Sequence, residues 1–284
     1  MTARPGSRLL DVVVPVLYDL YFSAILAGAA EAAYEHETRL VLSPTMHEHA
    51  REASLLDHLM QGVTQGALIV LPEESSVELE AALSDSRPFV VVDPLLPLDA
   101  RIPCVSADHR SGADQAMAHL LALGHRRIGA ITGPPGWAAT EDRRTGYHDA
   151  LAAAGIDADP TLEVASDFEF APGLAAAAAL LDVSAPPTAI FAFNDAIALG
   201  ALVAAHQRGI RVPEDVSIVG VDDIKYATIV SPPLTTVRQP LAEIGRTGVH
   251  LLIRLIEGER PQSVRIELPV RLVVRGSTAP PREH

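Results

Sequence analysis

Two aspartates at the end of a strongly apolar run are the residues of this sequence whose types and position best suit ligand chemistry. The run VSIVGVDD, residues 216–223, places β-branched residues ahead of Asp222 and Asp223. Such a run is typical of a strand in a parallel sheet that is covered on both faces. In open α/β sheets, ligands bind at the carboxyl ends of the strands. The sequence therefore predicts that Asp222 accepts hydrogen bonds from a bound polar molecule.

Other apolar runs also end in polar residues. Asp93 ends the run FVVVD, and Asn194 ends AIFAFN ahead of the next helix. Asp195 follows Asn194, and its carboxylate suits the free backbone N–H groups of a helix start. We therefore expect Asp195 to cap the helix that Asn194 and Asp195 open.

The elements that position these residues alternate between strand-like and helix-like segments, which indicates βαβ units around parallel sheets. Predicted strands cover residues 9–16, 39–43, 67–71, 89–93, 128–132, 162–165, 189–193 and 217–221. Predicted helices cover residues 22–36, 49–61, 77–84, 111–123, 143–154, 173–182, 196–208 and 241–257. Because this plan occurs twice, we expect two similar doubly wound lobes.

Composition limits the class of protein. The chain has 284 residues, of which 48% are hydrophobic and 20% charged, and no apolar run reaches the roughly 20 residues of a membrane span. Its formal net charge of −14 opposes binding to nucleic acid. The single cysteine, Cys104, forms no internal disulfide and fits a reducing compartment. We expect a cytoplasmic chain that binds DNA poorly by itself.

Motifs for cofactor, metal or nucleophilic chemistry are not apparent. The first βα turn has no G-x-G-x-x-G, and the sequence has neither a P-loop nor a G-x-S-x-G elbow. His47 and His49 have no partner cluster in the sequence, so we interpret them as solvated rather than metal-binding. We expect no cofactor, no metal and no catalytic residue.

Five segments give the chain a family resemblance. They are VGVDD with SPPLTTVRQP (219–240), FVVVDP (89–94), HLLALGHRRIGAITGP (119–134), EDRRTGYHDALAAAG (141–155) and AIFAFNDAIALGAL (189–202). In this order and spacing they resemble the sugar-binding core of the LacI/GalR family of bacterial transcription regulators. The resemblance covers nearly the whole chain.

The resemblance implies a type I periplasmic-binding-protein-like fold in which the chain crosses between two lobes three times. On that basis we expect an N-terminal lobe of residues 1–107 plus 241–262 and a C-terminal lobe of residues 108–240 plus 263–284. Family members begin with a helix-turn-helix domain, whereas only eight residues precede the first predicted strand. We therefore expect the DNA-binding domain to be absent from this chain.

The resemblance also implies a set of ligand-binding residues in a cleft between the lobes. Sugar hydroxyls need carboxylate, amide and guanidinium partners, and their C–H faces need aromatic rings. The expected ligand contacts are Asp19, Tyr21, Phe22, Asp93, Arg143, Phe168, Phe191, Asn194, Asp222 and Gln239.

Several of these residues have simpler interpretations. Tyr21 or Phe22 could fix the helix start by apolar packing. Arg143 could be a solvated arginine at a helix start, and Phe168 or Phe191 could belong to the core.

One position departs from the family pattern. Many sugar-binding relatives place arginine after the first-lobe acid, but Pro94 follows Asp93 here and offers no donor. The effector can therefore lack the hydroxyl arrangement that such an arginine reads.

The favoured function is an effector-binding and dimerisation core that binds a small sugar or related polar metabolite and couples lobe closure to operator affinity. Its expected partners are the effector, a second copy of the chain and, through the missing domain, operator DNA. One alternative is a solute-binding protein of a sugar transporter, which would need an export signal. Another is an α/β enzyme that uses Asp93, Asp222 and Arg143 on a sugar.

Overall fold

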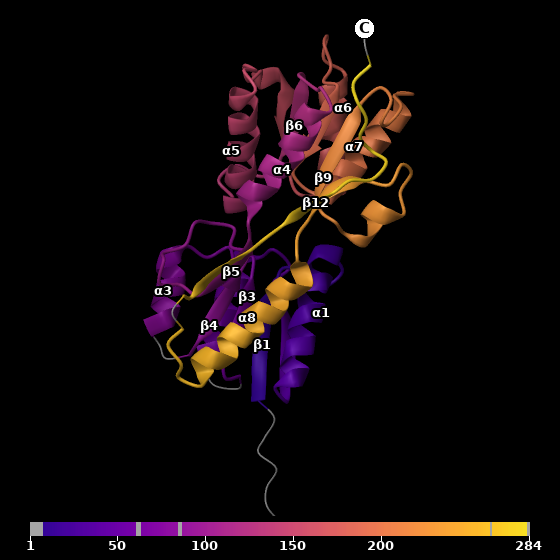
Figure 1. The fold of residues 1–284 in the computed structure, drawn as a ribbon. Coiled ribbons are helices and arrows are strands. Elements are labelled where there is room, and N and C mark those ends of the chain that lie inside the picture. The colour runs from indigo at the N-terminus through magenta and orange to yellow at the C-terminus, as the bar shows by residue number, and fades with distance from the viewer. Residues whose placement is uncertain (1–7, 61–63, 85–86, 262, 283–284) are drawn as a thin grey trace, which may run out of the picture. The chain divides into compact units, whose positions relative to one another are not determined.

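The chain forms two compact units, each made of two segments that are separate in the sequence. The computed structural model describes residues 8–60, 64–84, 87–261 and 263–282. One unit comprises Met1–Ala107 and Pro240–Leu268, and the other comprises Asp108–Gln239 and Pro269–His284. The chain therefore passes between the units three times (Figure 1).

The first unit is built on a parallel six-stranded sheet with the order β11-β5-β4-β3-β1-β2. Its strands are β1 (Arg8–Val14), β2 (Thr38–Pro44), β3 (Ala67–Val70), β4 (Phe89–Val92), β5 (Cys104–Ala107) and β11 (Arg265–Leu268). The central strands β3 and β4 are buried at every residue, as expected for a sheet covered on both faces. The order reverses direction at β1 and β3, which is where doubly wound sheets bind ligands.

The helices of the first unit are α1 (Leu20–Glu35), α2 (His49–Met60), α3 (Ser76–Ser84) and α8 (Leu241–Ile256). Helix α8 packs along α1 although more than 200 residues separate them (Figure 1). Glycine makes this crossing possible, because a Cβ at Gly28 would overlap the Ala242 carbonyl and one at Gly245 would overlap the Ile25 carbonyl. The helices therefore meet backbone to backbone.

The second unit repeats the plan with the order β12-β10-β9-β8-β6-β7. Its strands are β6 (Ile128–Thr132), β7 (Glu163–Ala165), β8 (Ala189–Ala192), β9 (Ser217–Asp222), β10 (Thr235–Arg238) and β12 (Arg271–Val273). All pair in parallel except β12, which is antiparallel to β10. Here the order reverses direction at β6 and β8.

The helices of the second unit are α4 (His109–Ala122), α5 (Ala138–Ala153), α6 (Phe170–Leu181) and α7 (Asp195–Gln207), with short 3-10 turns η1 (Pro160–Leu162) and η2 (Lys225–Thr228). Helices α6 and α7 lie side by side (Figure 1). Gly173 faces the Ile197 backbone, and Gly200 faces the backbone of residues 170–174. The alanine-rich α6 thus packs closely on its neighbour.

Two sequence-based boundaries were wrong. Strand β11 pairs with β5, so residues 265–268 belong to the first unit and not to the second. Helix α5 begins at Ala138 rather than at Arg143, which puts Arg143 in its second turn. The first correction depends on pairing between strands far apart in the sequence.

In the described part of the chain, no helix combines the length and apolar character needed to cross a membrane. Cys104 is a buried free cysteine, and burial raises the pKa of its thiol to about 12. It is therefore a protonated core residue near neutral pH.

Candidate functional site

In the first unit, Asp19, Tyr21 and Asp93 gather at the carboxyl edge of the sheet. Asp19 caps α1 by accepting the Tyr21 N–H at 2.6 Å, and this cap fixes the start of the helix. The Tyr21 hydroxyl donates to the Asp93 carboxylate, which is only 7% exposed. Asp93 has a left-handed φ of 50° immediately after β4, a conformation that Asp tolerates better than most residues. The turn directs the carboxylate to the phenol.

The neighbouring aromatic residue Phe22 is largely internal. Its ring meets that of Tyr21 edge to face at 5.3 Å between centroids, and 7% of the residue is exposed. Tyr21 is half-buried. Of the two, Tyr21 has the polar handle and the exposed surface that ligand contact requires, whereas Phe22 supports it.

In the second unit, Arg143 is buried rather than solvated. It is 4% exposed and donates from Nη1 to the Phe193 carbonyl at 2.7 Å. Its Nη2 lies 3.1 Å from His109 Nδ1, which must accept because a guanidinium has no acceptor. Its Nε is buried and has no hydrogen-bond partner among the described residues. The solvated-arginine interpretation is therefore wrong.

Aromatic rings lie against this arginine. The guanidinium carbon of Arg143 is 5.7 Å from the centroid of the Phe168 ring, within cation–π range. Trp137 packs on the same ring at 5.7 Å between centroids. A Cβ at Gly133 would overlap the Phe168 ring, so the glycine provides the space that this ring occupies.

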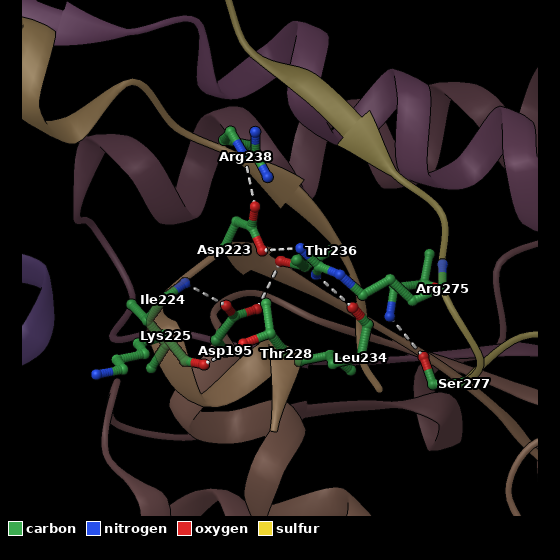
Figure 2. Close-up of polar contacts among 11 residues, drawn as sticks. Asp195, Asp223, Ile224, Lys225, Thr228, Leu234, Thr236, Arg238, Arg275 and Ser277 are labelled. Atoms are coloured by element: carbon green, nitrogen blue, oxygen red, sulfur yellow. Dashed lines mark hydrogen bonds and ion pairs between the residues drawn. The ribbon is translucent and has the colours of Figure 1, made fainter. Parts of the chain in front are cut away.

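The cap of α7 is Asn194 and not, as expected, Asp195. Asn194 is the residue that caps α7, accepting the Ile197 N–H at 2.8 Å and donating to the Phe168 carbonyl at 3.0 Å. Asp195 is fully buried and accepts from the Thr236 hydroxyl at 2.6 Å and the Ile224 N–H at 2.9 Å (Figure 2). Burial, followed by the nearby Asp222 carboxylate, raises the pKa of Asp195. Asn194 thus caps the helix, whereas Asp195 anchors the loop after β9.

Asp222 ends β9 and is joined to Gln239 at the end of the neighbouring strand. The Gln239 Nε2 donates to Asp222 Oδ1 at 2.7 Å, and the two residues are 4% and 6% exposed respectively. Asp222 has a φ of 119°, which is rare for a non-glycine residue and is a mark of functional positions. Gln239 Oε1 is buried without a hydrogen-bond partner among the described residues.

The second aspartate of the pair anchors this edge. Asp223 accepts from Arg238 at 2.5 Å and from Arg275 at 2.6 Å, and only 3% of its side chain is exposed (Figure 2). Because Arg238 ends β10 and Arg275 follows β12, the carboxylate ties two chain segments to the loop after β9. Asp223 therefore positions the edge of the sheet that carries Asp222.

Phe191 does not join either group. It is fully buried within β8 and packs in the core with Phe193 and Tyr147. As a mid-strand residue it lies away from the strand end, so the core interpretation replaces the ligand-wall prediction. Conversely, Trp137 and His109 were missed, although the only tryptophan of the chain stands in a strand-to-helix loop and could have been noticed.

The matching family model is the periplasmic binding protein-like domain, over residues 117–278. The two doubly wound units, with polar residues at the ends of their strands, match a periplasmic-binding-protein-like fold. The repressor CytR of Escherichia coli K12 is 36% identical over 278 residues, covering 97% of this chain and 80% of CytR.

Solved structures agree with this class. The CelR–cellobiose complex superposes with a TM-score of 0.88 at 33% identity, covering 96% of this chain and 86% of CelR. The lac repressor dimer bound to operator and an anti-inducer gives 0.86 at 27% identity, covering 98% and 96%. The chain belongs to the LacI family of transcription regulators, as its motifs predicted.

Proposed function

We propose that this chain is the effector-binding core of a transcription regulator and that it binds a small sugar or a related polar metabolite. The ligand would contact Tyr21 and Asp93 from the first unit, and Arg143, Asn194, Asp222 and Gln239 from the second. Phe168, with Trp137 behind it, would offer an aromatic face to the C–H groups of the ligand.

The observation that carries this proposal is a pair of buried polar atoms without partners. Arg143 Nε lacks an acceptor and Gln239 Oε1 lacks a donor among the described residues. An unsatisfied buried polar group costs about 1–3 kcal/mol, so such groups usually serve a function. A hydroxyl both donates and accepts, and a polyhydroxylated ligand could satisfy both atoms.

The coupling would work by population shift. A ligand that contacts both units favours the relative orientation in which both contacts form, and such couplings are typically about 1–3 kcal/mol. We propose that this orientation controls operator affinity in a homodimer in the cytoplasm, through a helix-turn-helix domain, and without catalysis. The similarity to a lac repressor dimer on its operator supports dimerisation.

A thermal-shift screen of mono- and disaccharides tests the ligand class. A ligand present at 100 times its dissociation constant adds about 2.7 kcal/mol of apparent stability. Asp222→Ala and Arg143→Ala should each abolish the response to a sugar that shifts the native protein. Arg126→Ala, at an exposed arginine that donates to the Ala154 carbonyl, is the matched control and should respond fully.

The experiment must distinguish a loss of ligand binding from a loss of folding. Circular dichroism should show that each variant folds. If both folded site variants respond like the native protein, the site assignment is wrong. If no saccharide shifts the native protein, the sugar class is wrong while family membership stands.

A further inference from the structure

A cavity lies in the second unit beside α5. It has a volume of about 500 Å³, within the range of small-molecule sites. Its lining combines α5, the end of β6, the η1 turn and the edge strand β7. Four small apolar residues form part of its wall, namely Pro135, Ala158, Pro160 and Ala165.

Successive arginines of α5 face different environments. Arg143 reaches the Phe193 carbonyl and His109, whereas Arg144 lines the cavity. Arg144 donates from Nε to Glu163 at 2.5 Å, and the same carboxylate pairs with His148 at 2.9 Å. Glu163 is thereby satisfied, and it holds the guanidinium in place.

The remaining groups of Arg144 and Glu141 are open for a ligand. Within the described chain, neither Nη of Arg144 makes a hydrogen bond, and Nη1 approaches Glu141 Oε2 only to 4.0 Å. The other Glu141 oxygen accepts the Gly136 N–H at 3.0 Å. An unused donor fork and an unused carboxylate oxygen therefore stand side by side at the cavity.

A buried hydroxyl adds an independent sign of a ligand. Thr140 lines the cavity, is 1% exposed, and its Oγ1 has no hydrogen-bond partner among the described residues. The third acid of the lining, Asp159, is already paired with Arg127 at 2.9 Å and with Thr161. It therefore contributes charge but no vacant acceptor.

We propose that this cavity binds a small zwitterion of the free amino acid class. The guanidinium fork of Arg144 matches a carboxylate in geometry and charge. The free oxygen of Glu141 accepts from an ammonium group, and the apolar wall accommodates a side chain. Glu141, Asp159 and Glu163 would repel a purely anionic ligand, and Arg144 would repel a purely cationic one. This inference does not depend on the proposed sugar site.

Saturation-transfer NMR of the full chain with each of the twenty standard L-amino acids, at about 10 mM, tests the inference. At least one should give a signal, and its N-acetyl and methyl ester forms should each bind about 10-fold more weakly or not at all. Arg144→Gln and Glu141→Gln should weaken binding by a similar factor. Arg208→Gln is the matched control, because Arg208 also pairs with a carboxylate, Asp182, but outside the cavity.

Any of four results would overturn it. The first is that no amino acid binds to the native protein. The second is that both derivatives bind as well as the free amino acid. The third is that Arg144→Gln and Glu141→Gln, shown to be folded, bind normally. The fourth is that Asp222→Ala removes the signal, because binding would then occur at the sugar site instead.

Discussion

The two units share one strand order, yet they place different chemistry at the carboxyl ends of their strands. In the first unit a phenol is bonded to one carboxylate, Asp93. In the second unit a buried guanidinium, an amide and a carboxylate are present, and two of their polar atoms have no partner within the described residues. Both units turn their acid out of the strand at a left-handed φ, 50° at Asp93 and 119° at Asp222. Both units thus use a positive φ to place an acid after a strand, but the second unit surrounds that acid with more charged and amide groups.

The largest expected effect on sugar affinity comes from removing a charge in the second unit. Asp222→Asn keeps an acceptor for Gln239 but removes the negative charge. Hydrogen bonds to charged groups contribute about 1.5–3 kcal/mol, so affinity for a responding sugar should fall roughly 10- to 150-fold. Isothermal titration would measure it, and an unchanged dissociation constant would show that charge is not what distinguishes the two units.

The helix crossing of the first unit is expected to tolerate no added methyl group. Gly245→Ala would force a Cβ into the Ile25 carbonyl, and such overpacking costs about 1–3 kcal/mol of unfolding free energy. Gly112→Ala is the control, because its Cβ would meet the Val237 side chain at 3.2 Å rather than backbone. Urea denaturation of both variants measures the difference, and equal stabilities would contradict the close crossing.

The units also differ in how buried titratable groups respond to pH. Burial, and then Glu74, raises the pKa of Glu52 in the first unit to about 9 from an ordinary value near 4.5. The native state therefore binds the extra proton between these values, and stability should fall as pH rises, by up to about 1.4 kcal/mol per unit.

Glu52→Gln should flatten this slope and stabilise the protein at pH 8, as urea denaturation between pH 5 and pH 8 would show. Glu37→Gln, at an exposed carboxyl outside the Glu52–Glu74 pair, is the control and should leave the slope intact. In the second unit, burial lowers the pKa of His125. Its contribution has the opposite sign, since stability is lost as pH falls below the ordinary value of 6.5. If the free energy of unfolding of the native protein and of Glu52→Gln changes with pH in parallel, Glu52 is not the cause of the slope.

The smallest expected effect is that of changing Tyr21 in the first unit. Tyr21→Phe removes the phenol donor to Asp93, but Asp93 keeps its charge, so sugar affinity should fall only about 5-fold, the equivalent of about 1 kcal/mol. Tyr18→Phe, at a residue that is 80% exposed, should change nothing. A loss for Tyr21→Phe as large as that for Asp222→Asn would erase the contrast between the units.

Much of the fold and the acidic strand ends could be predicted from the sequence, because they are local properties. An apolar β-branched run that stops at an acid specifies a buried strand and the place of its last residue, as at Asp93 and Asp222. The repeated βα alternation indicated two doubly wound lobes. The five motifs indicated the family.

Tertiary structure decided the rest. Asn194 and Asp195 are equally suited to cap a helix, and the choice fell to Asn194 because Thr236 and the Ile224 N–H, distant in sequence, engage Asp195. The partner of β11 was also undetermined, since nothing within residues 265–268 distinguishes β5 from a strand of the other sheet. The short-range periodicity of a sequence fixes which segments are strands and helices, but the neighbours of a side chain are set by long-range packing.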